Sequence, residues 1–346
     1  MSQTRIRIGI IGAGGNTRLR HIPGFQDVGG VEVAVICNRS EESSQRVADE
    51  FGVSKISTSW LDVVADPDLD AICIGTWPYL HADITIAALE SGKHVLTEAR
   101  MARNLEEAQS MAIAAEENSN LVAQIVPAPF SLDYDATIKR LLKELGAVRE
   151  VSVVHRFGAG ANADAAKSWR QDFDLSGYNT HTLGIHFETV QRWLGAEVDP
   201  AWLIADAELF VEERPSADDI AAKVTIPDAV SVLGRYNNGA KFNFDISSID
   251  CAAPVNEIRL NTEGGCLRFD FSTEELFLAD TASKKESKIT PDTGTDLGWC
   301  VEADFIESIR SGKAVELTSF DDGLRYMRFT EMVWQSWSNQ CARQEW

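Results

Sequence analysis

A short apolar strand that runs directly into a glycine-rich turn is the feature that most constrains this chain. The residues are Arg5-Ile-Arg-Ile-Gly-Ile-Ile-Gly-Ala-Gly-Gly-Asn-Thr17. Gly12 permits the tight turn at the end of the strand, and Gly14 lacks a Cβ atom, so a phosphate can approach the backbone. This order of strand, turn and helix start predicts a binding site for the pyrophosphate of a dinucleotide.

The residues after the turn are expected to complete the pyrophosphate site. The amides of Gly15, Asn16 and Thr17 are expected to begin the helix and to point at the anion, where the helix dipole favours negative charge. Dinucleotide sites usually carry a third glycine where this chain has Thr17, so the match is imperfect. The alternative is an ordinary strand-to-helix turn, and the context that follows argues against it.

Strands and helices alternate over the first 125 or so residues. Apolar runs predict strands at 31–37, 70–75, 94–97 and 121–126. Amphipathic periodicity and capping residues predict helices at 40–51, 80–88 and 104–115. Strands this apolar are typical of a parallel sheet that helices cover on both faces. We therefore predict an α/β dinucleotide-binding domain over residues 1–126, with a doubly wound (Rossmann) parallel sheet.

The pattern changes after Pro127. A helix, a long strand, a loop and a second helix are predicted at 138–145, 148–157, 158–176 and 178–194. Several strands follow between 202 and 280, with hairpin-type turns at Asn237–Gly239 and Glu263–Gly265. Helices near 298–311 and 319–338 complete the chain. Residues 127–346 are thus predicted to form an α+β substrate-binding domain with a largely antiparallel open sheet.

An open sheet has a face that must be covered. Helices can cover it, or a second copy of the chain can. The density of Trp and Phe late in the sequence favours a partner. We therefore expect a homo-oligomer, a dimer or tetramer, formed through the second-domain sheet.

Charge and composition restrict the partners. The chain has 346 residues and a formal net charge of −21, which argues against nucleic acid and anionic membranes. No apolar run reaches the roughly 18 residues of a membrane span, and the start of the chain does not resemble a signal peptide. The six cysteines show no metal-type spacing, and only Cys266 and Cys300 are candidates for reactivity. These features predict a cytoplasmic protein without a metal site.

The end of the second strand is expected to meet the adenosine ribose. Sites for NAD usually place a carboxylate there, whereas this chain has Asn38, Arg39 and Ser40. Asn38 and Ser40 can donate hydrogen bonds to a 2′-phosphate, and Arg39 can pair with it or stack on adenine. This pattern favours NADP over NAD as the cofactor. The alternative is that these residues only begin a helix.

Two further segments follow strands of the same predicted sheet. Thr76, Trp77 and His81 come after the strand at 70–75, where ligands bind in sheets of this type. Trp77 can lie along the nicotinamide or its ribose. His81 either contacts the cofactor or is an ordinary helix residue.

The next segment, Gly92-Lys-His-Val-Leu-Thr-Glu-Ala-Arg100, resembles the Gly-Lys-His-Val-Leu-x-Glu-Lys-Pro pattern of the glucose–fructose oxidoreductase / inositol dehydrogenase (Gfo/Idh/MocA) family. Further matching segments are Thr76-x-Pro78 with His81, Trp169-Arg170, Ser176-Gly177, Leu183-Gly-Ile-His186 and Arg192-Trp-Leu-Gly195. The resemblance covers nearly the whole chain. It implies that Glu98 lies near the nicotinamide and that Trp169 and Arg170 belong to the cofactor site.

The chain departs from the family pattern where the resemblance implies catalysis. The family's catalytic lysine aligns with Ala99 and its proline with Arg100. Its second-domain pattern, Asp-x-Gly-x-His-x-x-Asp, has Thr182 and Thr189 in place of the aspartates but keeps His186. Glu188 is one residue away from the second aspartate, about 100° around the helix, so it cannot simply replace it.

Hydride removal from a carbinol carbon requires a group that accepts the hydroxyl proton. His186 is the first candidate, since histidine titrates near neutral pH and this one borders the predicted buried stripe of its helix. The alternative is a structural histidine. His181 and Tyr178 are weaker candidates, and Arg100, which stays protonated, could only orient a carboxylate or polarise a carbonyl. Asp172 and Asp174 are expected to line the substrate pocket because of their place in the loop.

The sequence thus predicts an NAD(P)-dependent oxidoreductase that acts on a sugar, a polyol or a related hydroxy compound. Two alternatives follow from the missing lysine and aspartates. One is a regulatory protein that binds the cofactor without hydride chemistry. The other is a lyase or glycosidase that uses bound cofactor transiently.

Overall fold

The computed structural model describes residues 5–216, 220–282, 284–295 and 298–346, and the chain divides into two compact units. The first unit comprises Met1–Pro127 and Cys300–Met327, and the second comprises Ala128–Trp299 and Arg328–Trp346. This division differs from the predicted one, which kept 127–346 together. The segment from Cys300 joins the first unit because Phe305 of α9 (Val301–Ser311) packs on Phe25 of α1 (Ile22–Asp27), with 6.3 Å between ring centroids.

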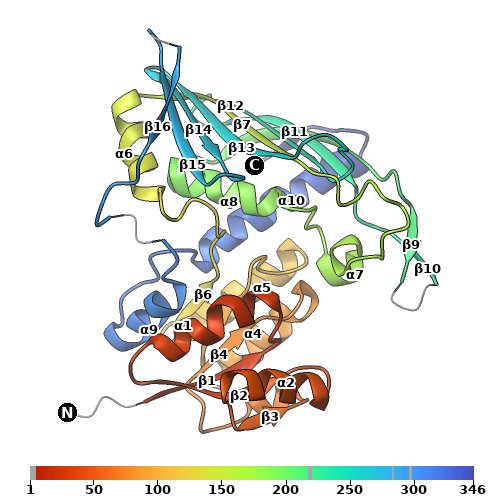
Figure 1. Ribbon diagram of the computed structural model, residues 1–346, viewed down its shortest axis with the longest axis vertical. Helices are drawn as coiled ribbons and strands as arrows, with labels where there is room; N and C mark the ends of the chain where they lie inside the picture. Colours follow the sequence, from red (N-terminus) through yellow and green to blue (C-terminus); the bar gives the residue numbers. More distant parts are fainter. Residues whose placement is uncertain (1–4, 217–219, 283, 296–297) are drawn as a thin grey trace. The chain divides into compact units, whose positions relative to one another are not determined.

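Six parallel strands form the sheet of the first unit (Figure 1). They are β1 (Ile6–Ile11), β2 (Val31–Cys37), β3 (Lys55–Ser57), β4 (Ala71–Ile74), β5 (His94–Thr97) and β6 (Ala123–Ile125). Their order is β3-β2-β1-β4-β5-β6. From β1 the chain adds β2 and β3 on one side, and from β4 it adds β5 and β6 on the other side, so the strand order reverses between β1 and β4. This is the predicted Rossmann sheet, and the reversal opens a crevice at the carboxyl ends of β1 and β4.

Helices cover this sheet as the periodicity predicted. They include the predicted helices α2 (Glu41–Phe51), α4 (His81–Glu90) and α5 (Leu105–Glu117), and also α3 (Trp60–Val64), which was not predicted. Apolar side chains such as Ile72 and Ile84 form one continuous cluster between the strands and α3, α4 and α5. Ser40 and Asn104 cap α2 and α5, because their side chains accept hydrogen bonds from the amides of Ser43 and Glu107. These caps fix where each helix begins at the edge that holds the crevice.

The glycine turn shows why Thr17 replaces the usual third glycine. After the turn a helix begins at Gly15 and contains a π-helical segment, η1 (Thr17–His21), before α1. Gly12 has φ +87°, and a Cβ there would lie 2.5 Å from the amide nitrogen of Thr76. The Thr17 hydroxyl donates to Gly12 O and fills the space beside Gly75, where a Cβ would lie 2.1 Å from Thr17 Oγ1. A glycine at position 75 thus makes room for the threonine at 17.

The second unit contains a mixed sheet of nine strands in the order β16-β15-β14-β13-β7-β12-β11-β8-β17. The strands in chain order are β7 (Val148–Arg156), β8 (Pro200–Glu208), β11 (Ala229–Tyr236), β12 (Lys241–Ser247), β13 (Val255–Thr262), β14 (Gly265–Asp270), β15 (Glu275–Asp280), β16 (Glu286–Ile289) and β17 (Gln344–Glu345). Only β7 and β12 pair in parallel, so the predicted antiparallel character and both predicted hairpins are confirmed. A separate hairpin, β9 (Glu213–Pro215) with β10 (Ala221–Lys223), was not predicted.

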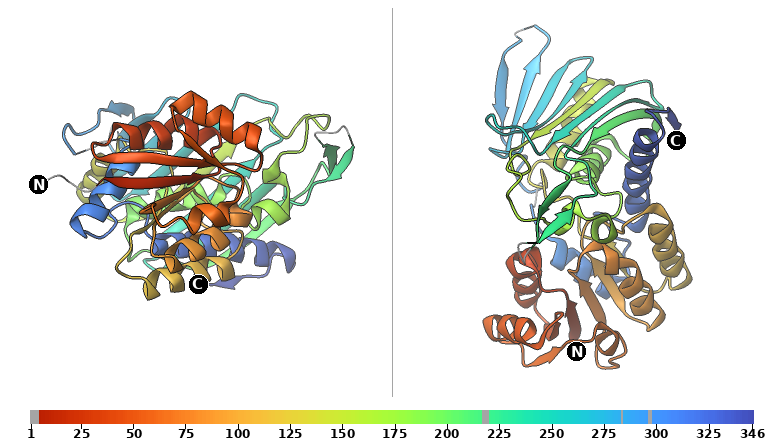
Figure 2. Two further views of the ribbon diagram at one scale, coloured as in Figure 1. Left: turned by 90° about the horizontal axis from the view of Figure 1, so that it is seen from below. Right: turned by 90° about the vertical axis from the view of Figure 1, so that its right-hand side faces the viewer.

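The helices of this unit are α6 (Asp135–Leu145), α7 (Phe173–Ser176), α8 (Leu183–Leu194) and the second half of α10 (Phe320–Ser338). In the right-hand view of Figure 2, α10 (blue) runs along one face of the sheet. Phe187 of α8 stacks on Phe329 of α10 with ring centroids 4.0 Å apart, and Phe329 also meets Phe244 of β12. Phe244 and Phe329, two of the late aromatic residues, are thus packed inside this unit, and oligomerisation stays a prediction.

The predicted helix at 178–194 is wrong at its start. Helix α8 begins at Leu183, and Tyr178 lies in the preceding loop. His181 has φ +48°, so the backbone is left-handed at a position inside the predicted helix, where the right-handed conformation is needed. The predicted loop 158–176 also contains a short 3-10 turn, η3 (Trp169–Gln171), and α7.

The fit of Thr17 beside Gly75 yields a stability prediction. Gly75→Ala is expected to lower the free energy of unfolding by about 3 kcal/mol, because the new Cβ overlaps Thr17 Oγ1 and the Gly12 carbonyl oxygen. Gly15→Ala is the matched control, since nothing lies within 4 Å of a Cβ there, and it should change stability by less than about 1 kcal/mol. Urea unfolding of the cofactor-free protein, followed by circular dichroism, measures both. Equal stability of the two variants would contradict this account.

Candidate functional site

A pocket of about 650 Å³ lies at the carboxyl edge of the parallel sheet in the first unit. Its lining comes from the glycine turn, the end of β2, the start of α2 and the segment after β4. The lining residues are Ile11, Gly12, Ala13, Gly14, Cys37, Asn38, Arg39, Ser40, Ser43, Arg46, Thr58, Trp60, Gly75, Thr76, Trp77, Tyr79 and Leu80. Seven predicted cofactor residues are therefore brought together: Gly12, Gly14, Asn38, Arg39, Ser40, Thr76 and Trp77.

Asn38 was expected to donate a hydrogen bond to a 2′-phosphate, but in this pocket its side chain bonds to the protein. Its Oδ1 accepts a hydrogen bond from the amide of Ala13 (2.8 Å), and its Nδ2 donates to the carbonyl of Ser43 (3.1 Å). The side chain therefore ties the glycine turn to α2, and its amide is already engaged within the protein. Ser40 is the N-cap of α2, so it too has a structural task.

Two arginines are the charged groups of the lining. Arg39 is exposed and lies over the ring of Trp77, with 5.2 Å from its guanidinium carbon to the ring centroid. Arg46, one turn into α2, also lines the pocket, and the sequence analysis missed it. The sequence does indicate this position, because Arg46 follows Ser43 by three residues and a helix brings such residues to the same side. The lining contains no carboxylate, so the pocket is locally positive within a chain of net charge −21.

His81 joins the loops that follow β4 and β5. Its Nε2 lies 3.0 Å from the carbonyl oxygen of Thr76, and its Nδ1 lies 2.8 Å from that of Arg100. The ring is buried, and burial lowers the pKa of His81 although the carbonyl contacts oppose the shift. These contacts place His81 in the framework that holds Thr76, and a direct contact with the cofactor stays a prediction.

A buried histidine that the sequence analysis missed lies between two carboxylates. The ring of His21, from η1, is fully buried. Its Nδ1 lies 2.5 Å from Oε1 of Glu302 in α9, and its Nε2 lies 3.1 Å from Oε1 of Glu98. Asn16 donates a further hydrogen bond to Glu98 (2.5 Å). This Glu98–His21–Glu302 triad connects the helix after the glycine turn, the end of β5 and α9.

The triad requires a charged histidine. An ionised carboxylate accepts hydrogen bonds, so with both glutamates ionised each ring nitrogen of His21 carries a proton and donates. Burial alone would lower the pKa of His21, but the hydrogen bonds and charges of Glu302 and Glu98 raise it to about 9. Burial likewise acts to raise the pKa of Glu98, and the contact with His21 lowers it below its ordinary value. Glu98, implied to lie beside the nicotinamide, is therefore held as a carboxylate with a fixed orientation.

Arg100 and Ala99 follow Glu98 in the loop after β5. Arg100 is 5% exposed, so this cation is buried in the first unit. The amide of Met101, the next residue, donates a hydrogen bond to the hydroxyl oxygen of Tyr326 in α10 (2.5 Å). The predicted roles of Arg100 toward a substrate stay predictions.

In the second unit, His186 is buried at the start of α8 and both its ring nitrogens have partners. Its Nδ1 lies 3.0 Å from the carbonyl oxygen of Thr182, and its Nε2 lies 2.8 Å from Oδ1 of Asn256 in β13. Burial lowers the pKa of His186, although both contacts oppose the shift. To take a proton from a substrate, Nε2 would have to give up Asn256. These contacts match the structural alternative given above for His186.

His155, at the end of β7, is a second histidine that the sequence analysis missed. Its Nδ1 lies 2.7 Å from the hydroxyl oxygen of Thr182, and its ring is 5.3 Å from that of His186. The ring is partly exposed, and in the part of the chain that the structure describes its Nε2 has no hydrogen-bond partner. Burial and the neighbouring His186 and His181 lower the pKa of His155 to about 4, so the ring is neutral at pH 7.

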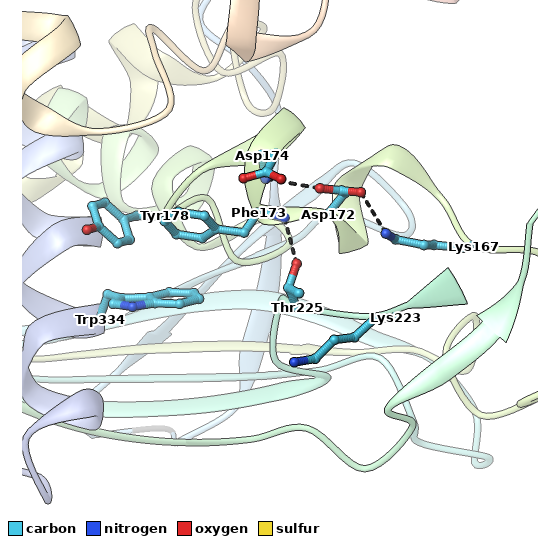
Figure 3. Close-up of a pocket in the computed structure, with 8 residues that line it drawn as sticks. All are labelled: Lys167, Asp172, Phe173, Asp174, Tyr178, Lys223, Thr225 and Trp334. Atoms are coloured by element: carbon cyan, nitrogen blue, oxygen red, sulfur yellow. Dashed lines mark hydrogen bonds and ion pairs between the residues drawn. The ribbon is translucent and has the colours of Figure 1, made fainter. Parts of the chain in front are cut away.

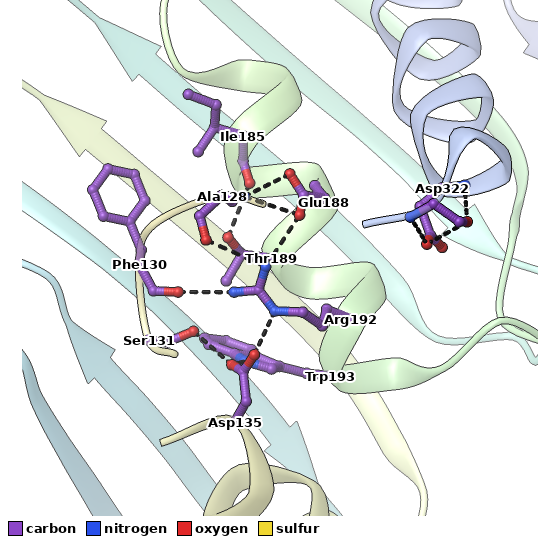
Figure 4. A network of polar contacts seen from close by, with 11 residues as sticks. Ala128, Phe130, Ser131, Asp135, Ile185, Glu188, Thr189, Arg192, Trp193 and Asp322 are labelled. Carbon is purple, nitrogen blue, oxygen red and sulfur yellow. Dashed lines mark hydrogen bonds and ion pairs between the residues drawn. The ribbon is translucent and has the colours of Figure 1, made fainter. Parts of the chain in front are cut away.

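Glu188 and Thr189 belong to a network that holds the segment before α6 on α8 (Figure 4). Glu188 accepts a hydrogen bond from the amide of Ala128 (2.9 Å) and pairs with Arg192 (3.1 Å), which also pairs with Asp135. The Thr189 hydroxyl donates to the carbonyl of Ile185 (2.9 Å). Glu188 thus belongs to a structural ion-pair network in this unit.

The remaining predicted site residues lie elsewhere in the second unit. Tyr178, Asp172 and Asp174 line one pocket (Figure 3), and burial raises the pKa of Tyr178, so its phenol stays protonated at pH 7. Trp169 and Arg170 form a cation–π pair, with 4.3 Å between the guanidinium carbon and the ring centroid. Their predicted part in cofactor binding stays a prediction.

All six cysteines are free. Burial raises the pKa of Cys37 to about 11, and burial with the neighbouring Asp304 raises that of Cys300 to about 12, so neither is a thiolate at neutral pH. Across residues 5–346, apart from the few that the structure leaves undescribed, no cluster of three or more His, Cys, Asp or Glu could hold a metal ion. None of the described helices is both long and apolar enough to cross a membrane.

The triad predicts a loss of stability at alkaline pH. Because the pKa of His21 is higher in the folded state (about 9) than the ordinary value of 6.5, the stabilisation is complete below pH 6.5 and is lost as the pH rises past about 9. A shift of this size corresponds to about 3 kcal/mol.

Chemical unfolding at pH 6.5 and pH 9.5 should show this decline in the unmodified protein and not in His21→Gln. His94→Gln, which alters a half-buried histidine outside the triad, should keep it. A decline of the same size in His21→Gln would refute the charged triad.

Comparisons with known proteins agree with this geometry. Residues 6–125 match the family described as "Oxidoreductase family, NAD-binding Rossmann fold", and residues 136–268 match the "GFO/IDH/MocA C-terminal domain". The levoglucosan dehydrogenase of Pseudarthrobacter phenanthrenivorans is 23% identical over an alignment that covers 90% of this chain and 88% of the relative. The 1,5-anhydro-D-fructose reductase of Ensifer adhaerens is 40% identical, over only 32% of this chain and 33% of that protein.

Solved structures show the same fold. An oxidoreductase domain protein from Kribbella flavida superposes with a TM-score of 0.87 at 25% identity, over 99% of both chains. A levoglucosan dehydrogenase in complex with NADH and levoglucosan superposes with a TM-score of 0.85 at 20% identity, also over 99% of both chains. The two matching segments, the sheet order and the glycine turn lead to one conclusion: the chain belongs to the Gfo/Idh/MocA family of NAD-binding oxidoreductases.

Proposed function

We propose that the chain transfers a hydride between a nicotinamide cofactor and a hydroxyl-bearing carbon of a sugar, a polyol or a related compound. The observation that carries this proposal is the pocket at the reversal point of the parallel sheet, where Gly12 and Gly14 meet the ends of β2 and β4. Relatives named as an inositol 2-dehydrogenase and a levoglucosan dehydrogenase act on compounds of this class, which supports the choice of substrate.

The cofactor contributes hydride transfer at the nicotinamide ring, and the residues of the chain bind and orient it. Gly12 and Gly14 fit a pyrophosphate, since the turn is open to the pocket and a Cβ at Gly12 would collide with the backbone. The first-turn amides of the following helix supply a positive end for the anion. Asn38 holds this turn against α2 and so keeps the phosphate site in shape.

We further propose that the cofactor is NADP. Two guanidinium groups, those of Arg39 and Arg46, line the pocket beside the end of β2, where the adenosine ribose is expected, and no carboxylate lines it. A 2′-phosphate would pair with these cations, whereas the two ribose hydroxyls of NAD are usually bound by a carboxylate.

Proton transfer at the substrate hydroxyl requires a second group. We propose His155 for this role ahead of His186, because its ring is partly exposed and the Thr182 hydroxyl holds Nδ1, while Nε2 has no hydrogen-bond partner among the described residues. His186 would first have to lose its contact with Asn256. Ala99 at the position of the family's lysine, with Thr182 and Thr189 at those of its aspartates, favours the alternative of a cofactor-binding protein without turnover.

The arginines give a test of cofactor choice. Arg39→Ala and Arg46→Ala should each weaken NADPH binding by about 10- to 100-fold, the usual size of a lost charged hydrogen bond, and should change NADH binding by less than about threefold. Arg18→Ala is the control, since Arg18 is exposed in the same unit and pairs with Glu50 outside the pocket. Isothermal titration of the unmodified chain and the three variants measures the affinity of each for both cofactors. An equal loss of NADH binding, or tighter binding of NADH by the unmodified chain, would contradict the NADP assignment.

A screen of cofactor reduction over polyols, aldoses and sugar acids tests the reaction itself. With an active substrate, His155→Gln should lower kcat by about 10²- to 10⁴-fold while the affinity for the cofactor stays unchanged. His186→Ala should instead lower the melting temperature, with a smaller effect on kcat. Unchanged turnover in His155→Gln would remove His155 from the mechanism. Cofactor binding without turnover on the whole panel would favour the regulatory alternative.

A further inference from the structure

A pocket of about 550 Å³ in the second unit shares no lining residue with the dinucleotide pocket of the first unit, and the proposed hydride transfer assigns it no role. It is formed by the segment from Lys167 to Tyr178, by the end of the β9–β10 hairpin and by α10 (Figure 3). A volume of this size holds a ligand of one or two sugar rings.

Three aromatic side chains form one wall of this pocket. The ring centroids of Phe173, Tyr178 and Trp334 are 5.2–5.3 Å from one another, with interplanar angles of 45–69°. Trp337 supports Trp334 from the next turn of α10, at 5.0 Å. All three wall residues are half-buried, so part of each ring stays open to a ligand. Figure 3 shows the three rings gathered at one end of the pocket.

Hydrogen-bond donors and acceptors also line this pocket. Lys223 lies at the edge of the pocket and forms no ion pair or hydrogen bond with the part of the chain that the structure describes. The Tyr178 hydroxyl and the Trp334 indole N–H likewise have no partner among the described residues. Asp174 supplies an exposed carboxylate. Two lysines and two aspartates line the pocket, so their formal charges cancel, and a neutral ligand is favoured over an anion.

Hydrogen bonds to the neighbouring hairpin and its flanks hold the aromatic wall in place before any ligand binds. Lys167 pairs with Asp172 (2.6 Å), and the amide of Phe173 donates to the hydroxyl of Thr225 (2.7 Å). The amide of Thr225 in turn donates to the carbonyl of Gln171 (3.0 Å). A preformed wall loses little conformational entropy on binding, as a binding site requires.

We propose that this pocket binds a neutral saccharide, one pyranose ring of which lies against the wall of Phe173, Tyr178 and Trp334. The C–H groups of a pyranose carry a slight positive charge and fit the negative face of an aromatic ring. Neighbouring hydroxyls both donate and accept, and Lys223 with Asp174 supplies one partner of each kind. No residue of this pocket lines the dinucleotide pocket, so sugar binding here can be measured without the cofactor and independently of hydride transfer.

Saturation-transfer NMR and calorimetric titration of the full chain without cofactor test the assignment. The probes are glucose, maltose, myo-inositol and the anions gluconate and glucuronate. The neutral sugars should bind more tightly than the anions. Trp334→Ala should weaken that binding by about five- to tenfold, because it removes the largest ring of the aromatic wall. Trp334→Phe, which keeps an aromatic face, should restore part of it.

Lys223→Ala is the second variant, since Lys223 is exposed and its loss should not affect folding. It should weaken sugar binding by about three- to tenfold, and Lys313→Ala, an exposed lysine of the first unit, should not. Each variant is first checked for unchanged NADPH affinity. The proposal is overturned if no neutral sugar binds, if gluconate or glucuronate binds more tightly, or if Trp334→Ala and Lys223→Ala bind sugars as the unmodified chain does.

Discussion

A single imidazolium ring, that of His21, connects the parts of the first unit on which cofactor binding depends. It lies between Glu98 at the end of β5 and Glu302 in α9, two residues that are 204 positions apart in the sequence. A buried charge is stable only with a partner of opposite sign, so each carboxylate requires the ring, and the ring requires both. The triad thereby explains why the segment from Cys300 belongs to the first unit although it follows the whole second sheet.

The same triad sets the charge beside the expected nicotinamide position. Two carboxylates and one imidazolium leave a net charge of about −1 there, while Arg39 and Arg46 make the other part of the pocket positive. A dinucleotide with phosphates at one end and a neutral or cationic ring at the other matches this distribution. Local charge, rather than the net charge of −21, therefore decides which anions the first unit accepts.

The local patterns of the sequence predicted most of the fold, because strands, caps and tight turns depend on neighbouring residues. The glycine turn, the caps at Ser40 and Asn104 and the hairpins at Gly239 and Gly265 all lie where they were expected. Contacts between distant residues were not predictable in this way. Nothing near Thr17 in the sequence shows that Gly75 leaves space for it, and His21 and Glu302 are 281 residues apart.

The candidate site was therefore predicted in outline and not in detail. Asn38 and His186 were chosen for their chemistry, yet each side chain is engaged in bonds to the protein that a single sequence does not reveal. Arg46, His155 and Trp334 were overlooked because each contributes through a pocket or contact formed by several chain segments.

The protonation state of His21 tests the account most directly. Two-dimensional ¹⁵N NMR of the imidazole nitrogens, with the signals assigned by their absence in His21→Gln, reports whether each nitrogen carries a proton. The account predicts an imidazolium at pH 7, with both ring nitrogens protonated and titration only near pH 9. A neutral His21 ring at pH 7, with one unprotonated nitrogen, would contradict it.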